Sequence, residues 1–266
     1  MHTFHVTLSS VGRVLLARGV DQLRALVRAL TRSCQGRLLM FSLVDDHAHL
    51  LPRTNHPGLL GRELVRAARG VVPGLQLQAP HVAPVESRAH LLRLVDYLLD
   101  QPRKHGLAAH PALWEGSCFQ DLLGARLLPG FDRTALVAEL PRLRLGQLFP
   151  RVGLRPELIA PAGPELLLAA GVGRILELAA GVFALPLPLE GHARPQVEAR
   201  ALAAQMALRA GFRPGGIAPL LGLGERGLRK LLRRPVPAEA CLALTRRLAL
   251  ELRVASENAW QPGPRG

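Results

Sequence analysis

Two histidines separated by one residue are the first feature of this sequence that could perform chemistry. They are His47 and His49, in the stretch "DDHAHLLP" over residues 45–52. Side chains two residues apart on a strand point to one face, so both imidazoles would face one ion while Ala48 faces the core. Such a pair suits a divalent metal. Because the chain has ten histidines, a chance pair is also common, and a metal site needs a third ligand and a reacting group.

A single tyrosine, Tyr97, is the second candidate. Gln101 follows four residues later on the same helical face, which His90 and Arg93 extend backwards. Two interpretations remain open. The stripe is a solvated helix face with a surface tyrosine, or the phenol meets the metal and attacks a phosphodiester while the amide oxygen of Gln101 completes the metal site.

Four segments resemble, in one order, the motifs of the REP-associated tyrosine transposases, which are single-tyrosine HUH transposases. The segments are "HVTLSSVGRVLL", "DDHAHLL", "YLLDQPRKHGL" and "LWEGSCFQDLLG". In that family a His-hydrophobic-His strand precedes a helix reading Tyr-x-x-x-Asn/Gln-Pro, and a loop with tryptophan and small residues follows. The resemblance covers residues 2–130, about half of the chain, and implies a ferredoxin-like nuclease domain.

The resemblance also implies roles for individual residues. His47, His49 and Gln101 match the metal ligands, and Tyr97 matches the nucleophile. The implied cofactor is Mg²⁺ or Mn²⁺, which would neutralise a non-bridging phosphate oxygen and orient the leaving 3′ oxygen. The tyrosine would form a 5′-phosphotyrosine and free a 3′-OH, so that reversal joins a second strand. The implied substrate is single-stranded or hairpin DNA.

Two features depart from the family pattern. The turn before the histidines is Asp45-Asp46 where relatives usually have Pro-Asn, and the segment from His49 to Tyr97 is short and lacks an aromatic, basic stretch. An extra carboxylate beside the ion would either strengthen metal binding or repel a phosphate, and both alternatives stay open.

Cations around the tyrosine are candidate phosphate contacts. They are Arg93, Arg103 and Lys104, and the alternative is that they are generic surface charges. His90 and His105 are interpreted as polar surface residues rather than ligands.

Composition favours a polyanionic partner. Lys+Arg number 34 against 20 Asp+Glu, which gives a net charge of +14 and a pI near 11.5. A coding bias toward arginine is the alternative, because only Lys104 and Lys230 are lysines. Cys34, Cys118 and Cys241 are odd in number and far apart, which favours neither a disulfide framework nor a CxxC zinc site. We expect a cytoplasmic protein, because no secretion leader is visible and charges and prolines interrupt the most apolar stretch.

The first half must position these residues, and its pattern predicts an α+β sandwich with a mostly antiparallel sheet. The expected order begins with a strand that turns near residues 9–12 and a helix that Asp21 caps. Strands over 37–44 and 47–53, a helix over 56–70 and a strand over 74–85 follow. The last expected element is a helix over 87–101, which Ser87 caps and Pro102 helps to end. The apolar face of the first helix is expected at Leu23, Leu26, Val27 and Leu30.

The second half is expected to be helical and separate. We predict a nuclease-like domain over 1–148, a Pro- and Gly-rich linker over 149–164, an all-α domain over 165–255 and a frayed tail over 256–266.

Residues 215–234 have helix-turn-helix spacing. Ile217 and Ala218 lie on the expected first helix, Gly222 at the turn, and Leu228 and Leu231 on the second. The exposed side of that second helix would present cations to duplex DNA, namely Arg226, Arg229, Lys230 and Arg233. A helical hairpin with a solvated basic face is the alternative. Together with the helix at 196–212, the segment resembles the C-terminal DNA-binding domain of bacterial replication initiators.

The interpretation that unites these features is a metal-dependent endonuclease and strand transferase of the transposase type. It would act on single-stranded or hairpin DNA, bind duplex DNA through its C-terminal domain and have no membrane partner. Whether it forms a homodimer is left open. A domesticated DNA-binding regulator without cleavage activity is the main alternative. A structural protein whose arginine content is only compositional is the third.

Overall fold

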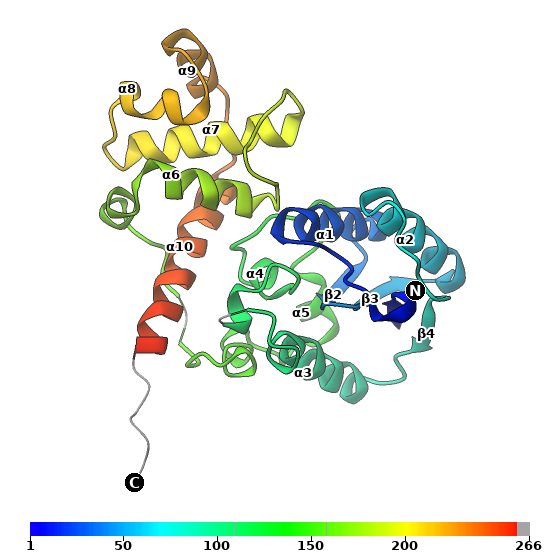
Figure 1. The fold of residues 1–266 in the computed structure, drawn as a ribbon. Helices are drawn as coiled ribbons and strands as arrows, with labels where there is room; N and C mark the ends of the chain where they lie inside the picture. The colour runs from blue at the N-terminus through cyan, green and yellow to red at the C-terminus, as the bar shows by residue number, and fades with distance from the viewer. Residues whose placement is uncertain (109, 158, 260–266) are drawn as a thin grey trace. The chain divides into compact units, whose positions relative to one another are not determined.

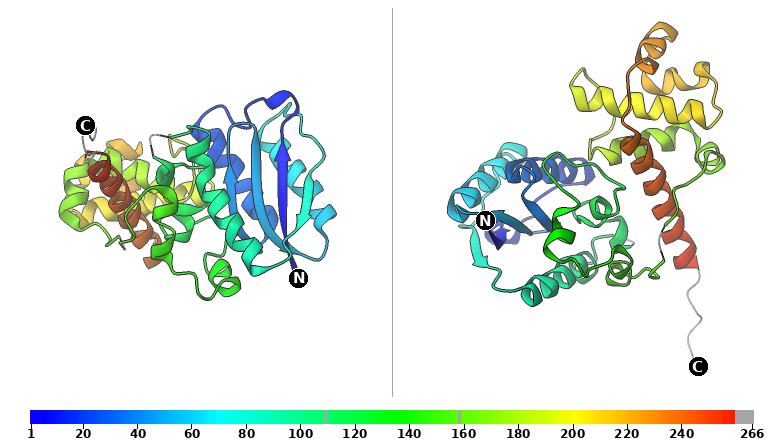
Figure 2. Two further views of the ribbon diagram at one scale, coloured as in Figure 1. Left: turned by 90° about the horizontal axis from the view of Figure 1, so that it is seen from below. Right: turned by 180° about the vertical axis from the view of Figure 1, so that it is seen from behind.

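The computed structural model describes residues 1–108, 110–157 and 159–259. It divides into two compact units, and each is described by itself (Figures 1 and 2). The first comprises Met1–Leu123 and Leu128–Leu158, and the second comprises Gly124–Leu127 and Ile159–Gly266.

The first unit is a mixed α+β structure. Its main elements are β1 (His2–Ser9), α1 (Val20–Cys34), β2 (Leu38–Leu43), β3 (His47–Thr54), α2 (Pro57–Val71), β4 (His81–Pro84) and α3 (Arg88–Lys104). Short helical turns follow or intervene: η1 (Val11–Arg13), η2 (Pro111–Leu113), α4 (Phe119–Leu122), α5 (Ala135–Glu139), η3 (Leu145–Gln147) and η4 (Pro150–Val152).

The four strands form one antiparallel sheet in the order β2-β3-β1-β4. The antiparallel sheet expected from the sequence is therefore confirmed. Figure 1 shows α1 and α2 on one side of the sheet and α3 on the other. All six residues of β2 are buried, including Ser42, as its largely apolar sequence predicts. In β1 the burial alternates instead, with Val6 and Leu8 buried and His5 and Thr7 only half-buried.

The apolar face expected for α1 is confirmed, because Leu23, Leu26, Val27 and Leu30 are all buried. The expected cap is wrong. The residue before the helix is Gly19, with no side-chain cap, and Asp21 lies in the first turn. A carboxylate in that position still interacts favourably with the positive end of the helix dipole.

Ser87 caps α3 as expected, since its hydroxyl accepts a hydrogen bond from the backbone N–H of His90 at 3.1 Å. Pro102 does not end the helix at once, because α3 continues to Lys104. A proline removes one backbone donor, and the helix ends two residues later. The strand expected over 74–85 is also shorter than predicted: only β4 is regular, and Leu77 makes an isolated bridge to Ser10.

The second unit is helical over its described residues. Its elements are α6 (Pro164–Val182), α7 (Arg194–Arg209), α8 (Pro214–Ile217), η5 (Pro219–Leu221), α9 (Glu225–Leu232) and α10 (Ala238–Ala259). Leucine and alanine side chains from α6, α7 and α10 build one apolar core, with Ile175, Leu202 and Leu244 at 0 % exposure. Close helix packing is possible there because many of the α7 residues are alanines.

The boundary between the units falls inside the expected linker, between residues 158 and 159. The first part of that linker packs into the first unit, where Phe149 and Val152 are buried. Of the expected tail, residues 256–259 continue α10 and residues 260–266 lie outside the described part of the chain. Cys34, Cys118 and Cys241 are buried as thiols. Within the described ranges, no helix combines the length and apolar content needed to cross a bilayer.

Candidate metal and nucleophile site

The histidine pair lies on one face of β3, as the alternation predicts. Ala48 and Leu50 are buried at 1 % and 0 % exposure, while the ring centroids of His47 and His49 lie 4.6 Å apart. His49 is opposite Thr7 of β1 and Ser42 of β2, so it sits within the sheet. His47 begins the strand beside the turn.

Tyr97 of α3 reaches the same face. Its hydroxyl lies 3.3 Å from Nε2 of His49, and the two rings are 5.2 Å apart at their centroids. The tyrosine is 37 % exposed, so a ligand from solvent can approach the phenol. The structure therefore brings the lone tyrosine to the histidine pair.

The second ring nitrogen of His49 also has partners on the sheet. Nδ1 lies 3.0 Å from Nε2 of His5 and 3.3 Å from Oγ1 of Thr7. Either neutral tautomer satisfies these contacts, because the protonated nitrogen donates and the other accepts. Burial, followed by the neighbouring His47, His5 and His105, lowers the pKa of His49 to about 3. His49 is therefore a neutral imidazole near neutral pH.

His5 and Thr7 were not anticipated as part of this site. The alternation of β1 places both on the face opposite Val6 and Leu8. Only the pairing of β1 with β3 brings them opposite His49, and strand pairing is not visible in sequence periodicity.

Gln101, the expected third ligand, lies one turn after Tyr97. Its side chain is buried at 3 % exposure, and its amide nitrogen donates to the backbone carbonyl of Tyr97 at 3.3 Å. The amide nitrogen is thus directed at its own helix.

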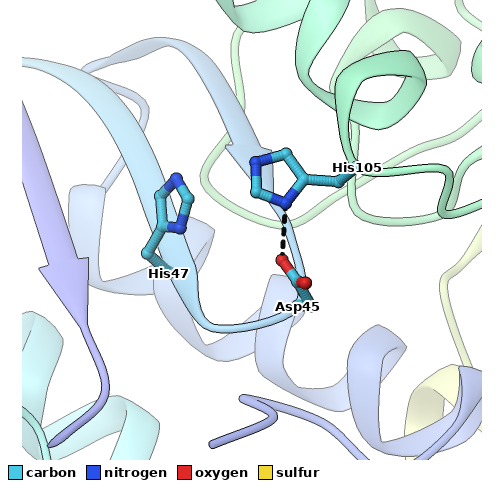
Figure 3. Close-up of side chains that lie close together, drawn as sticks. All are labelled: Asp45, His47 and His105. Atoms are coloured by element: carbon cyan, nitrogen blue, oxygen red, sulfur yellow. Dashed lines mark ion pairs between the residues drawn. The ribbon is translucent and has the colours of Figure 1, made fainter. Parts of the chain in front are cut away.

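Two other side chains, Asp45 and His105, gather around His47, and the three can hold a metal ion (Figure 3). One ligand atom from each of Asp45, His47 and His105 lies within 4.8 Å of the other two. Nδ1 of His105 is 2.8 Å from Oδ1 of Asp45. The residues come from the turn before β3, from β3 itself and from the position after α3. His105, which the sequence analysis interprets as a polar surface residue rather than a ligand, is therefore part of a candidate metal cluster.

Asp46 orients His47. The Nδ1–H of His47 donates to Oδ1 of Asp46 at 2.6 Å, and this hydrogen bond lowers the pKa of the Asp46 carboxyl. With Nδ1 engaged, Nε2 of His47 is the nitrogen left for a metal. Histidine ligands in proteins are commonly held by a carboxylate in this way. The two aspartates of the turn thus have different contacts.

A pocket of about 430 Å³ adjoins Tyr97. Its lining includes three cations, Arg103, Lys104 and Arg151, together with Asp96 and Asp100.

The cations beside the tyrosine differ in their contacts. Arg103 and Lys104 pair with Asp100 at 2.6 Å and 3.3 Å, and Lys104 Nζ lies 5.2 Å from the centroid of the Tyr97 ring. Arg93 is exposed on α3. Arg151 was not anticipated, because it falls in the segment interpreted as a linker.

The tryptophan loop of the family resemblance packs against the edge of β2. Nε1 of Trp114 donates to the carbonyl of Leu43 at 2.7 Å. A Cβ on Gly116 would lie 2.4 Å from the same indole nitrogen and 2.5 Å from that carbonyl oxygen. A buried ion pair at 2.7 Å joins Glu115 of this loop to Arg24 of α1. The loop therefore supports the sheet edge from which the turn and β3 continue.

In the second unit, the apolar residues of the expected helix-turn-helix segment are buried, but the expected first helix is short, because α8 ends at Ile217 and Ala218 follows it as the C-cap. Ile217, Ala218, Leu228 and Leu231 are buried, and Gly222 adopts a left-handed conformation with φ +65°, which glycine allows without strain. The four cations expected on the second helix are all exposed: Arg226, Arg229, Lys230 and Arg233.

Models of protein families, curated proteins and solved structures give no match to this chain, so the chemistry of the site is inferred from its own residues.

Proposed function

We propose that this chain is a metal-dependent single-strand DNA endonuclease and strand transferase of the transposase type, with Tyr97 as nucleophile. The observation that supports this function best is the 3.3 Å approach of the Tyr97 hydroxyl to Nε2 of His49. The two residues are distant in sequence, yet they meet on the face that also holds His47.

The fold of the first unit supports the same proposal. Its elements follow the order β-α-β-β-α-β, which is the order of a ferredoxin-like domain. The histidine strand β3 is central in the sheet, and the tyrosine helix α3 follows the last strand.

The residues at the site fit a divalent cation. Neutral imidazoles and a carboxylate are suitable donors, and the cluster of Asp45, His47 and His105 provides both within 4.8 Å. When bound, the cation would supply neutralisation of a non-bridging phosphate oxygen. His47 belongs both to this cluster and to the pair with His49, so the proposal requires only that the ion binds beside His47.

The reaction assigns a defined task to Tyr97. Its phenolic oxygen attacks phosphorus and forms the Tyr–O–P bond, while the bond from phosphorus to the 3′ oxygen breaks. The phenol proton is lost and the leaving oxygen gains a proton, so the products are a 5′-phosphotyrosine and a 3′-OH. No oxidant or water is consumed, and attack by another 3′-OH reverses the step onto a second strand.

The cations of the adjoining pocket would hold the DNA backbone. Arg103, Lys104 and Arg151 line it, and the charges of Asp96 and Asp100 limit its net positive potential. A phosphodiester binding there would be close to the phenol, and side chains that position a reacting bond contribute strongly to rate.

A covalent-adduct assay tests the proposal. Labelled single strands with flanking hairpins are incubated with the protein and Mn²⁺ or Mg²⁺, and the denatured products are separated by size. We expect an adduct that requires the metal and is absent in Tyr97→Phe. The single variant Phe4→Tyr, which adds a second tyrosine on β1, should form the same amount of adduct as wild type. Equal cleavage by Tyr97→Phe would exclude Tyr97 as the nucleophile.

A DNA-binding regulator without cleavage activity is the second candidate. The exposed cations of α9, which include Arg226, Arg229 and Lys230, favour it, since they would bind duplex phosphates whether or not the first unit cleaves. Salt-sensitive duplex binding without any adduct would support this alternative.

A further inference from the structure

We infer that the metal ion of this site is held by Asp45, His47 and His105, and that His49 and Gln101 are not ligands. The inference rests on the proposed function for the role of the ion, but it concerns binding alone and is tested without DNA.

The contacts of His49 are the first argument. One of its nitrogens faces the Tyr97 hydroxyl at 3.3 Å and the other faces His5 at 3.0 Å and Thr7 at 3.3 Å. Whichever tautomer is present, its single lone pair is directed at a protein group. Binding a metal through His49 would break one of these contacts.

Gln101 provides the second argument. It is buried, at 3 % exposure, so its amide oxygen, which is the atom that would bind a metal, is largely shielded from solvent, and the hydrogen bond from its amide nitrogen to the helix holds the side chain in that orientation. The side chains of Asp45, His47 and His105 are instead partly exposed, at 40 %, 20 % and 27 %. Solvent therefore reaches the cluster, and Oδ1 of Asp45, which is buried and makes no hydrogen bond of suitable geometry, is an acceptor that a bound ion would satisfy.

The geometry of the cluster is the third argument. Ligands at about 2.1 Å from one ion lie roughly 3 Å from each other in common geometries. Nδ1 of His105 and Oδ1 of Asp45 are 2.8 Å apart, which is close to that separation. Figure 3 shows the His105 ring directed at Asp45, with the His47 ring beside them.

Asp46 completes the arrangement outside the ligand set. Its carboxylate accepts the Nδ1–H of His47 at 2.6 Å, which leaves Nε2 for the ion. Such a partner fixes both the tautomer and the ring orientation of a histidine ligand. The Asp45-Asp46 turn therefore supplies one ligand and one supporting carboxylate.

The donor set also predicts which metals bind. Two imidazoles and one carboxylate suit first-row transition ions such as Mn²⁺ and Zn²⁺ better than Mg²⁺, which prefers oxygen ligands. We expect tighter binding of Mn²⁺ than of Mg²⁺ at equal pH and ionic strength.

Mn²⁺ titration of the full-length protein, followed by electron paramagnetic resonance, tests the ligand set. We expect one saturable site in wild type, and an affinity reduced by about tenfold or more in Asp45→Asn and in His105→Asn. Gln101→Ala and His49→Asn should retain the wild-type affinity within about threefold. Asp100→Asn is the matched charge control, because it removes a carboxylate that contacts Arg103 and Lys104 but does not belong to the cluster.

The opposite pattern would overturn the inference: loss of Mn²⁺ binding in Gln101→Ala or His49→Asn, with unchanged binding in the other two variants. Absence of a saturable site in wild type would also overturn it. Should a variant misfold, nitrogen-detected NMR of the histidine rings of wild type gives an independent answer. Zn²⁺ should shift the ring signals of His47 and His105, and shifts confined to His47 and His49 would refute the assignment.

The adduct assay is separate from this test. Metal binding that depends on Asp45 and His105 without any adduct would leave the ligand set intact and remove the proposed function. An adduct accompanied by metal binding that depends on His49 and Gln101 would support the proposed function and refute the ligand set.

Discussion

The hydroxyl of Tyr97 and Nε2 of His49 lie 3.3 Å apart although 48 residues separate them in sequence. The contact joins the exposed side of α3 to the middle of the sheet. It depends on His49 being held from its other side by β1, through His5 and Thr7. The position of the phenol therefore depends on three elements, α3, β3 and β1.

His5 is predicted to position His49. Replacing it in His5→Phe removes the 3.0 Å contact to Nδ1, so the ring of His49 loses a hydrogen bond that holds its orientation. We expect adduct formation to slow by about tenfold or more, because the phenol is less well positioned, with Mn²⁺ affinity unchanged. His5→Gln, which keeps a polar group, should recover part of the rate. His2→Phe, at the exposed start of the same strand, is the control, and equal rates in His5→Phe and wild type would contradict the prediction.

Protonation of His49 is predicted to make stability depend on pH. The folded protein has a pKa of about 3 at His49, against about 6.5 for an unperturbed histidine. As the pH falls below about 6.5, the unfolded chain takes up a proton that the folded protein does not, so stability is lost between about 6.5 and 3. The slope from this residue is at most ~1.4 kcal/mol per pH unit.

Urea denaturation between pH 7.5 and 5, with chelator present, measures this dependence. Wild type should lose more stability than His49→Gln over the same interval. Because the pKa of His5 is also lowered, chiefly by burial, only the difference between the two proteins isolates His49. Identical slopes would show that His49 is readily protonated in the folded state.

Gly116 is predicted to be intolerant of any side chain. In Gly116→Ala the new Cβ would lie 2.5 Å from the backbone carbonyl of Leu43, and backbone cannot move aside without disturbing β2. We expect a loss of about 1–3 kcal/mol in the free energy of unfolding. Gly70→Ala, in α2 with nothing within 4 Å of the added Cβ, should instead be neutral or stabilising by up to ~1 kcal/mol. Thermal denaturation of the two variants distinguishes these outcomes, and equal melting temperatures would contradict the clash.

The exposed face of α9 is predicted to bind duplex DNA phosphates. Arg226→Ala combined with Arg229→Ala should weaken duplex binding across sequences. If both residues contact phosphates, the slope of log K against log salt should fall in magnitude by about 1.8. Arg194→Ala, an exposed arginine of α7 in the same unit, serves as control. Fluorescence anisotropy at several salt concentrations gives both quantities, and an unchanged slope would remove α9 from the interface.

Local pattern was sufficient to predict most elements of the first unit. The apolar spacing of Leu23, Leu26, Val27 and Leu30 identified α1, and the run before Asp45 identified β2. Helix termini were less predictable, since Asp21 lies inside the first turn and Pro102 is tolerated near the end of α3. In both cases the observed helix end differs from the expected one by two or three residues, because side-chain preferences define a helix end only to within a few residues.

The candidate site was only partly predictable, because its members meet through tertiary structure. His47 and His49 share a face by strand geometry alone, which a sequence can show. His105 contacts Asp45 because the end of α3 lies beside the turn before β3. Hydrophobic periodicity in the sequence does not predict this proximity. The same limit applies to Arg151, since a Pro- and Gly-rich composition resembles a linker whether or not the segment packs.

The two edge strands of the sheet, β2 and β4, limit strand pairing between two copies of this protein. On one side, the amide of Leu43 donates to the carbonyl of Gly116, and Cys118 donates to Phe41, so β2 is already occupied by its own loop. On the other side, β4 has only four residues and ends in Pro84, which lacks a backbone donor. The edges therefore offer few backbone groups for extending the sheet into a second copy. Where self-association occurs, it should use side-chain surfaces and leave the strand pairing unchanged.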